Sequence, residues 1–144
     1  MIREAVFSDL DRLLELYTFL HGNPIPEKDD KLADLWDRIM SDRDHHIIVA
    51  GEDGIIASSC VCVIIPNLTH GQQPYAFVEN VVTRPEYRKK GLATACLDFA
   101  RDIAEKEGCY KIMLLTGSKE ESTLRFYERA GFNRNDKTAF IRWI

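Results

Sequence analysis

The amino-acid sequence predicts a mixed α/β domain, in which about four helices flank one twisted, mostly antiparallel sheet. Two periodicities carry this prediction. Runs of β-branched residues mark strands, and apolar residues three or four positions apart mark amphipathic helices. The third observation is the order strand, helix and strand over residues 75–83, 91–107 and 110–115. Such a crossover makes its two strands parallel, so the sheet should contain one parallel pair.

The N-terminal half predicts three strands and two helices. A strand over Ile2–Val6 precedes Ser8-Asp9, a pair typical of a helix N-cap, and a helix should follow to about Leu20. The next helix carries an apolar face made of Leu32, Leu35, Trp36, Ile39 and Met40. The remaining elements are a strand over His46–Ala50, an Asp-Gly hairpin turn at residues 52–54 and a strand over Ile55–Ile65.

The C-terminal half predicts three strands and two helices. The strand Tyr75–Thr83 ends before Pro85, and the helix that follows stops at Gly108. The near-continuous apolar run Tyr110–Leu115 is typical of a strand covered on both faces. The last two elements are a helix from about Lys119 to Ala130, ending at Gly131, and a closing strand over Thr138–Trp143.

Length and charge restrict the classes of protein that fit. The 144 residues predict a single domain over 1–144, and the net charge of −4 argues against a broad nucleic-acid surface. The charge is uneven, because residues 1–72 hold 6 basic and 13 acidic side chains, whereas residues 73–144 hold 13 and 10. The second half is therefore better suited to an anionic ligand.

The sequence predicts a cytoplasmic protein. The first residues contain no basic stretch followed by an apolar run, and no apolar segment approaches the roughly 20 residues of a membrane helix. The four cysteines fit reduced structural thiols better than a disulfide framework or a metal site, and no metal is expected.

A basic loop at the start of the long helix is the most informative motif. The segment Arg88-Lys89-Lys90-Gly91-Leu92-Ala93 follows a predicted strand and opens a predicted helix. The first turn of a helix has free N–H groups and a positive dipole end, so it binds phosphate well. Gly91 lets the backbone approach a ligand, because it has no Cβ atom. The alternative interpretation is a solvated basic turn.

Two motifs resemble the GCN5-related N-acetyltransferase superfamily. Residues 88–93 match its pyrophosphate loop, Arg/Gln-x-x-Gly-x-Gly/Ala, and residues 126–132 match its later Phe-Tyr-x-x-x-Gly-Phe segment. The order of elements between them also matches. Segments 78–82 and 108–112 add some likeness to the glucosamine-6-phosphate N-acetyltransferase branch, although Asn80 stands where that branch has aspartate.

The resemblance implies acetyl-CoA as cosubstrate and acetyl transfer to an amine, with no metal. By the same resemblance, the strand backbone pairs with the pantetheine arm, and the basic loop wraps the pyrophosphate. The implied cofactor-binding residues are Val81, Val82, Thr83, Arg88, Lys89, Lys90, Gly91, Leu92, Ala93, Thr94 and Tyr127. Glu120 occupies a position where many relatives have asparagine, and Ser118 or Ser122 could take over that contact.

Acetyl transfer to an amine needs a base for the amine and an acid for the leaving thiolate. Glu79 is the first candidate base, and strand alternation would place it on the same face as Val81. The alternative interpretation of Glu79 is a solvent-facing carboxylate, and the competing bases are His21, His45, His46 and His70. Tyr127 is the candidate acid, by the family match, and otherwise belongs to a core aromatic pair.

The acceptor is the least determined part of the prediction. A primary amine of a small molecule (amino sugar, polyamine or amino-acid-like) is favoured, with direct attack in a ternary complex rather than through an acetyl-cysteine. The alternatives are a protein lysine or N-terminus, and a non-catalytic sensor that binds CoA. Neither nucleic acid nor membrane is expected as a partner. By family analogy, a homodimer would place Phe140, Trp143 and Ile144 at its interface.

Overall fold

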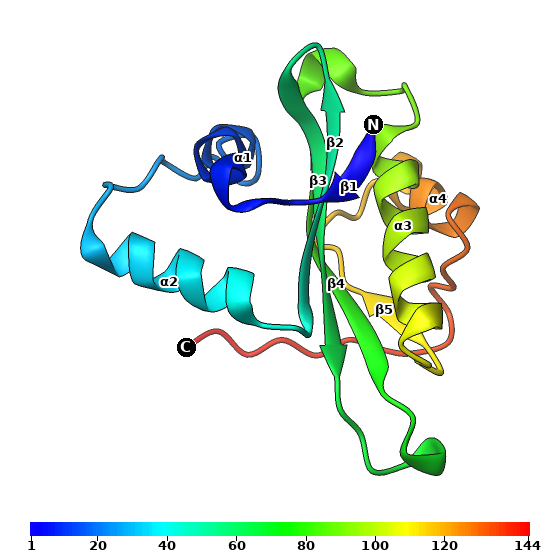
Figure 1. Cartoon of the computed structure of the whole chain (residues 1–144). Coiled ribbons are helices and arrows are strands. Elements are labelled where there is room, and N and C mark those ends of the chain that lie inside the picture. Colours follow the sequence, from blue (N-terminus) through cyan, green and yellow to red (C-terminus); the bar gives the residue numbers. More distant parts are fainter.

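The computed structural model describes residues 1–144 and contains a five-stranded sheet in the order β1-β2-β3-β4-β5 (Figure 1). Its first four strands pair antiparallel, and β4 pairs with β5 in parallel. The mixed fold with one parallel crossover is therefore confirmed. The strands are β1 (Ile2–Glu4), β2 (His45–Glu52), β3 (Ile55–Ile65), β4 (Tyr75–Thr83) and β5 (Ile112–Leu114).

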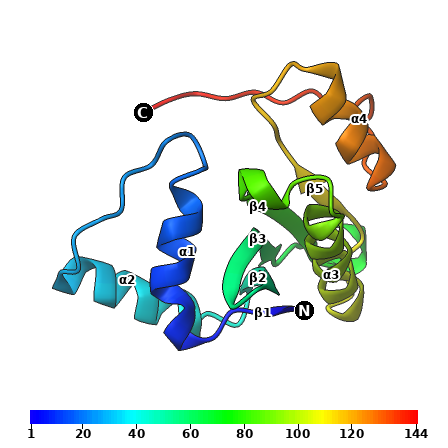
Figure 2. The same ribbon diagram turned by 90° about the horizontal axis from the view of Figure 1, so that it is seen from above.

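Helices lie on both faces of the sheet (Figure 2). One face is covered by α1 and α2, and the other by α3, while α4 lies beyond the β5 side. Three short 3-10 turns cover Phe7–Asp9, His70–Gln72 and Pro85–Tyr87. The helices are α1 (Leu10–Tyr17), α2 (Asp30–Ser41), α3 (Leu92–Lys106) and α4 (Glu121–Arg129).

Two apolar cores result from this layering. The α3-side core joins 11 buried residues, with Ile48, Cys60 and Val78 from the sheet and Cys96 and Leu97 from α3 among them. The α1-side core joins 8 buried residues, including Leu13, Leu16, Trp36, Val49 and Val61. Neighbouring residues of β2 and β3 alternate between the two cores, as strand geometry requires. The second predicted helix forms as α2, in which Trp36 is buried and Leu35 is 49% exposed.

Asp9 ties β1 to the start of α1, in a role that differs from the expected N-cap. Its carboxylate does not cap α1 but accepts hydrogen bonds from Arg3 Nη1 at 2.6 Å and from the Val6 amide at 2.8 Å. The side chain is almost fully buried. The hydrogen bond from Arg3 is the main cause that holds the pKa of Asp9 below its ordinary value.

β5 is shorter and more exposed than its apolar sequence predicts. It covers three residues of intermediate burial, and the following Leu115 is 44% exposed. The expectation of a strand covered on both faces is therefore wrong. The reason is that the strand residues buried in the α1-side core come from β2, β3 and β4 and none comes from β5, so this face of β5 is not covered.

The expected closing strand over Thr138–Trp143 does not form in this chain. Residues 136–144 are extended, yet they make no hydrogen bond with the rest of the molecule. Phe140 and Trp143 are 91% and 89% exposed. A β-strand needs a paired neighbour, and this segment reaches none within its own chain.

None of the four helices combines the length and the apolar character that a membrane-spanning helix needs.

Candidate active site

The candidate site lies where β4 and β5 separate. The two strands pair only from Ala76–Val78 to Ile112–Leu114, although β4 continues to Thr83. The β5-facing edge of residues 79–83 consequently has no strand partner. An unpaired edge exposes N–H and C=O groups that can pair with another extended molecule. This edge can therefore hold a ligand that has amides of its own.

A β-bulge in β4 shapes this edge. Glu79 lies opposite Val61 and Val82 lies opposite Ser59, so two β4 residues face the single residue Cys60. Asn80 has a positive φ of 52°, which asparagine tolerates better than most residues. The extra residue bends the strand and interrupts its pairing.

The bulge also overturns the alternation expected for β4. Val81 packs against the α3-side core, and Val82 belongs to the α1-side core. Glu79 pairs with Val61, a member of the α1-side core, so it lies on the α1 side of the sheet. Glu79 and Val81 therefore lie on opposite faces, because the bulge adds one residue between them.

The basic loop leads into α3 with its first-turn amides uncapped. Gly91 is the N-cap with φ 79°, and no side chain caps the helix. No atom lies within 4 Å of where a Cβ would be at Gly91, so the positive φ is what favours glycine here. The amides of Leu92, Ala93 and Thr94 come before the first helical donor, Ala95. This arrangement fits a diphosphate.

The three cations of the loop differ in their surroundings. Lys90 Nζ lies 3.4 Å from Glu52 Oε1, so its charge is already paired. Arg88 Nε donates to the Thr83 carbonyl at 3.4 Å, and neither Arg88 nor Lys89 forms an ion pair. Two cations of the loop therefore remain for an anionic ligand.

Tyr127, the candidate acid, packs against the α3-side core, against which Val81 of this edge also packs. It lies on α4 and packs edge-to-face on Phe126 and Phe132, at ring-centroid distances of 5.0 and 6.4 Å. Burial is the main cause that raises the pKa of Tyr127, and the nearby Cys60 adds to it. Its hydroxyl makes no hydrogen bond within the chain, so the phenol is a protonated donor with no competing partner.

Glu79 and Tyr127 approach β4 from opposite sides of the sheet. Glu79 is exposed on the α1 side and forms no ion pair, whereas Tyr127 packs with the α3-side core. The two side chains therefore lie on opposite faces of the sheet at this edge.

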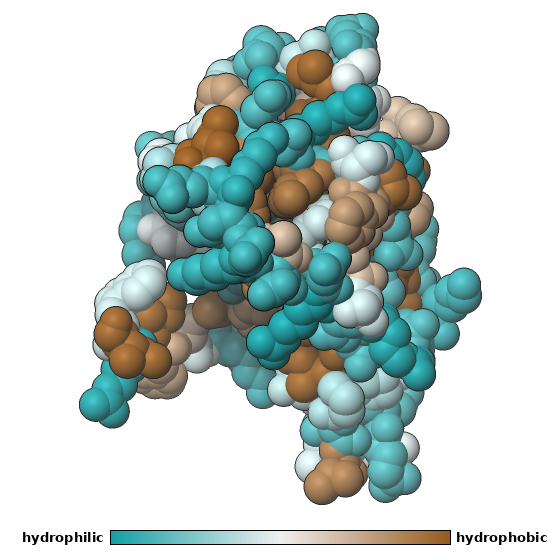
Figure 3. All heavy atoms as spheres, turned by 60° about the vertical axis from the view of Figure 1, so that its left-hand side comes forward, coloured by the Kyte–Doolittle hydropathy of each residue, from teal (hydrophilic) through white to brown (hydrophobic).

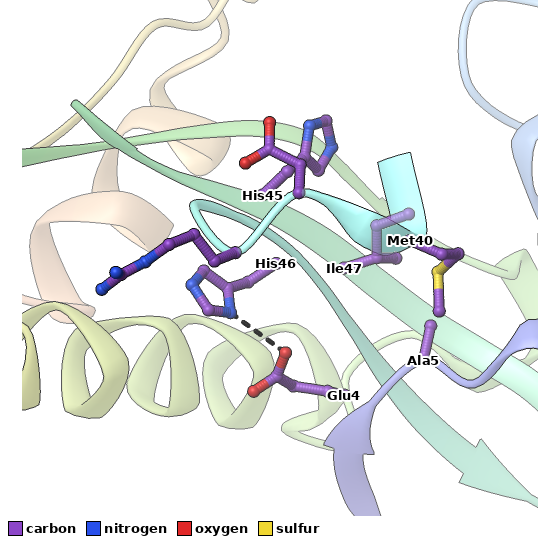
Figure 4. Close-up of a pocket in the computed structure, with 8 residues that line it drawn as sticks. Glu4, Ala5, Met40, His45, His46 and Ile47 are labelled. Carbon is purple, nitrogen blue, oxygen red and sulfur yellow. Dashed lines mark hydrogen bonds and ion pairs between the residues drawn. The ribbon is translucent and has the colours of Figure 1, made fainter. Parts of the chain in front are cut away.

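The histidines that competed with Glu79 have other surroundings. His45 and His46 line an open hollow of about 250 Å³ at the start of β2 (Figure 4). His46 Nδ1 lies 3.0 Å from Glu4 Oε2, as the dashed line in Figure 4 shows. His70 stacks on Tyr110 at 3.9 Å, at the β3–β4 turn. His46 and His70 are therefore engaged with other side chains, whereas His45 only lines the hollow.

Sequence reasoning missed two features of this region. The left-handed Asn80 escaped detection because a bulge depends on how two strands pair, although asparagine itself was a weak signal. The contacts from the β2–β3 turn to the basic loop also escaped, because their partners lie more than 30 positions apart.

Comparison with known proteins identifies the class and then the family. An uncapped helix start beside an unpaired strand edge defines a site for a ligand that carries both a diphosphate and an extended, amide-containing arm. Residues 10–132 match a family model described as "Acetyltransferase (GNAT) family". The chain therefore belongs to the GNAT family of acetyltransferases and is an acetyl-transferring enzyme. Members of this family use acetyl-CoA.

Several relatives are similar over most of their length. A glucosamine 6-phosphate N-acetyltransferase of Trypanosoma brucei brucei is 32% identical over 131 residues, which cover 90% of this chain and 86% of that protein. An aminoglycoside N(6')-acetyltransferase of Serratia marcescens is 24% identical over 93% of this chain and 92% of that protein. A solved structure of a putative acetyltransferase from Agrobacterium tumefaciens is 35% identical, with a TM-score of 0.91 and 99% of both chains covered.

Proposed function

We propose that the single domain of residues 1–144 transfers the acetyl group of acetyl-CoA to a primary amine of a small molecule, by direct attack in a ternary complex. The observation that carries this proposal is the unpaired edge of β4 next to the uncapped start of α3. Together they offer an amide-pairing edge and an anion site in two segments that follow one another closely in the chain. Acetyl-CoA supplies the activated acyl group.

The cosubstrate would lie along residues of two adjoining segments. The diphosphate would bind the first-turn amides of α3, with Arg88 and Lys89 as unpaired cations. The edge from Val81 to Thr83 would pair with the amides of the pantetheine arm. Lys90 would add a cation if its ion pair with Glu52 opens, and the full proposed set is Val81, Val82, Thr83, Arg88, Lys89, Lys90, Gly91, Leu92, Ala93, Thr94 and Tyr127.

Glu79 and Tyr127 would divide the proton transfers. Glu79 takes a proton from the attacking ammonium, directly or through water, and so frees the nitrogen lone pair. The nitrogen bonds to the carbonyl carbon, the carbon–sulfur bond breaks, and Tyr127 donates its proton to the departing sulfur. A backbone amide at the β4 edge would donate to the carbonyl oxygen. The nitrogen then loses its second proton, through water, to the Tyr127 phenolate, and Glu79 releases the proton it took to solvent, so the products are the N-acetylated amine, CoA and one proton.

A small amine is favoured because similar proteins are named for such acceptors, glucosamine 6-phosphate and aminoglycosides among them. The exposed Glu79 carboxylate on the open α1 side suits a cationic amine. A protein lysine or N-terminus is the second candidate, since this open side would also admit a peptide. A CoA-binding sensor without catalysis is the third, and the presence of both Glu79 and Tyr127 argues against it.

The decisive experiment is an acceptor screen that measures release of CoA from acetyl-CoA. Amino sugars, their phosphates, polyamines, amino acids and peptides are tested with the same preparation. We expect release with one small-amine class at a rate far above acceptor-free hydrolysis. Release with peptides alone would favour the second candidate, and CoA binding without release in any arm would favour the sensor.

We also propose that the enzyme is a homodimer joined through residues 136–144. The outer edge of β5 has no partner in the sheet, and the C-terminal segment is extended and unpaired. Figure 3 shows the face that carries α1 and α2. Exposed apolar side chains lie on two projections at the lower end of this face. Two copies that exchange these segments would close both free edges and bury Phe140 and Trp143 symmetrically.

Sedimentation velocity tests the dimer. The unaltered chain should sediment as a dimer at micromolar concentration, and the double variant Phe140→Ser/Trp143→Ser should sediment as a monomer. Leu68→Ser is the matched control, since Leu68 is similarly exposed, at 88%, but lies at the β3–β4 turn. A monomeric unaltered chain would overturn the dimer and leave the proposed chemistry intact.

A further inference from the structure

The turn between β2 and β3 contacts the loop that leads into α3. Tyr87 Oη donates a hydrogen bond to Asp53 Oδ2 at 3.1 Å. Lys90 Nζ donates to Glu52 Oε1 at 3.4 Å. The same ammonium lies 4.5 Å from the centroid of the Tyr87 ring. Two neighbouring acidic residues therefore hold two residues of the basic loop.

These contacts lie on either side of the loop's two unpaired cations. Tyr87 ends the 3-10 turn Pro85–Tyr87, and Lys90 directly precedes Gly91. Between them, Lys89 has a positive φ of 61°. This short loop contains two left-handed residues, Lys89 and Gly91. Without other contacts to hold it, few of its conformations would leave the first-turn amides of α3 accessible. Contacts at both ends reduce the number of conformations that it samples.

The β2–β3 turn is well suited to hold the loop. It joins two long antiparallel strands, which pair with one register shift between Ala50 and Gly51, and its tip is defined by Asp53 and Gly54 with φ of 53° and 77°. This left-handed pair matches the twist of a hairpin. The carboxylates are therefore carried by a hydrogen-bonded hairpin, whereas the loop they hold follows the end of β4 that pairs with β3 but has no partner on its β5 side.

Charge distinguishes the two contacts. The pair of Glu52 and Lys90, whose side chains are 35% and 47% exposed, would weaken as an anionic ligand competes for the ammonium. The bond from Tyr87 to Asp53 joins a neutral phenol to a carboxylate, so it contains no cation that a diphosphate would attract. The contact made by Asp53 is therefore the less sensitive of the two to a bound diphosphate.

We propose that Asp53 is a positioning residue of the cofactor site, which acts through Tyr87 to keep the loop into α3 open for the diphosphate. This inference rests on the proposed binding of acetyl-CoA at that loop. Asp53 touches neither the acyl group nor the acceptor amine. Its loss should therefore weaken cofactor binding and leave the chemical step unchanged.

A double-mutant cycle on Asp53→Ala and Tyr87→Phe tests the pair. KM for acetyl-CoA and kcat are measured with the best acceptor, and Kd for CoA by calorimetry. Each single variant should raise KM and Kd about threefold to tenfold at unchanged kcat. The double variant should be no worse than the poorer single variant, because both remove the same bond. Asp53→Asn keeps an acceptor oxygen and should bind CoA within about twofold of the unaltered enzyme.

Two controls keep the result interpretable. Alanine is strained at the left-handed Asp53, whereas Tyr87→Phe leaves the backbone of the turn unaltered, so the tyrosine variant alone can refute the idea. Tyr110→Phe at the other end of the sheet should leave KM unchanged. The inference is overturned if the increases in KM and Kd caused by Asp53→Ala and Tyr87→Phe multiply in the double variant. It is also overturned if each increase is less than twofold. Either result would leave the proposed function intact. Failure of the unaltered chain to bind CoA would overturn the proposed function as well.

Discussion

The two halves of the sheet contrast sharply. In the half formed by β1–β3, Ile48, Val49 and Ala50 are fully buried between helices on both faces. In the other half, β4 and β5 share only three paired positions, and Glu79 and Asn80 are exposed. The first half supplies packing, whereas the second leaves backbone and side chains available for a ligand. Variants in the first half should therefore affect stability, and variants in the second half should affect activity.

Replacement of Gly91 in the open half should have the largest effect. Gly91→Val forces a β-branched residue to adopt φ 79° or to leave that conformation, and the first-turn amides of α3 then lose their arrangement. We expect acetyl-CoA binding to become undetectable by calorimetry while the chain stays folded. Gly71→Val is the matched control, since Gly71 also has a positive φ and open space around it, far from the site. Equal loss of binding in both variants would contradict the loop assignment.

Removal of the Tyr127 hydroxyl should have the next largest effect. Tyr127→Phe keeps the ring that packs on Phe126 but removes the proton donor, so kcat should fall about 100-fold with CoA affinity unchanged. Tyr110→Phe should retain full turnover. A kcat for Tyr127→Phe close to that of the unaltered enzyme would contradict the role of Tyr127 as the acid that protonates the departing thiolate.

Replacement of Glu79 should have a smaller effect, which depends on pH. Glu79→Gln removes the proposed base, and kcat should fall about tenfold or more because water must carry the proton alone. The fall in rate on the acidic side of the pH profile should also disappear. Glu120→Gln is a matched control on α4. If the rate of Glu79→Gln still falls on the acidic side of the pH profile, Glu79 is not the base and another group takes that role.

The closed half should respond in stability rather than in rate. Asp9→Asn leaves Arg3 without its buried partner and should lower the free energy of unfolding by about 3 kcal/mol. Asp98→Asn breaks an exposed pair with Arg101 and should cost less than about 1 kcal/mol. Denaturant unfolding measures both. A large loss of kcat in folded Asp9→Asn would contradict the prediction that variants in the closed half affect stability and not activity.

The Asp9 carboxylate should make the protein less stable as the pH falls into the acidic range. Because the pKa of Asp9 is lowered in the folded state, its contribution is fully present above the ordinary value of 3.8. It is lost as the pH falls through the lower pKa of the folded protein. The unaltered chain should therefore lose stability more steeply than Asp9→Asn in acid, where the two should converge.

In both halves, the sequence predicts the features that are determined by residues adjacent in the chain. The bounds of β3 and β4 agree with the prediction, because long β-branched runs end at turn-forming residues. The start of α3 is also predicted, since Gly91 and its basic neighbours act locally. These features depend on residues adjacent in sequence.

Features that depend on distant partners were not predictable. The bulge at Asn80 follows from how β3 and β4 pair, and it reverses the side on which Val81 lies. The strand expected over Thr138–Trp143 has the right residue pattern but lacks a neighbour in its own chain. The contact of Asp53 with Tyr87 joins two loops that nothing in the local sequence connects.

Amide hydrogen exchange with and without CoA tests the central claim most directly, which is that the unpaired edge of β4 and the start of α3 form one cofactor site. At saturating CoA, we expect slower exchange over residues 79–83 and 88–94. Exchange over residues 45–50, beside the hollow lined by His46, should not change. Protection confined to that hollow, or unchanged exchange at both β4 and α3 in the presence of bound CoA, would contradict the claim.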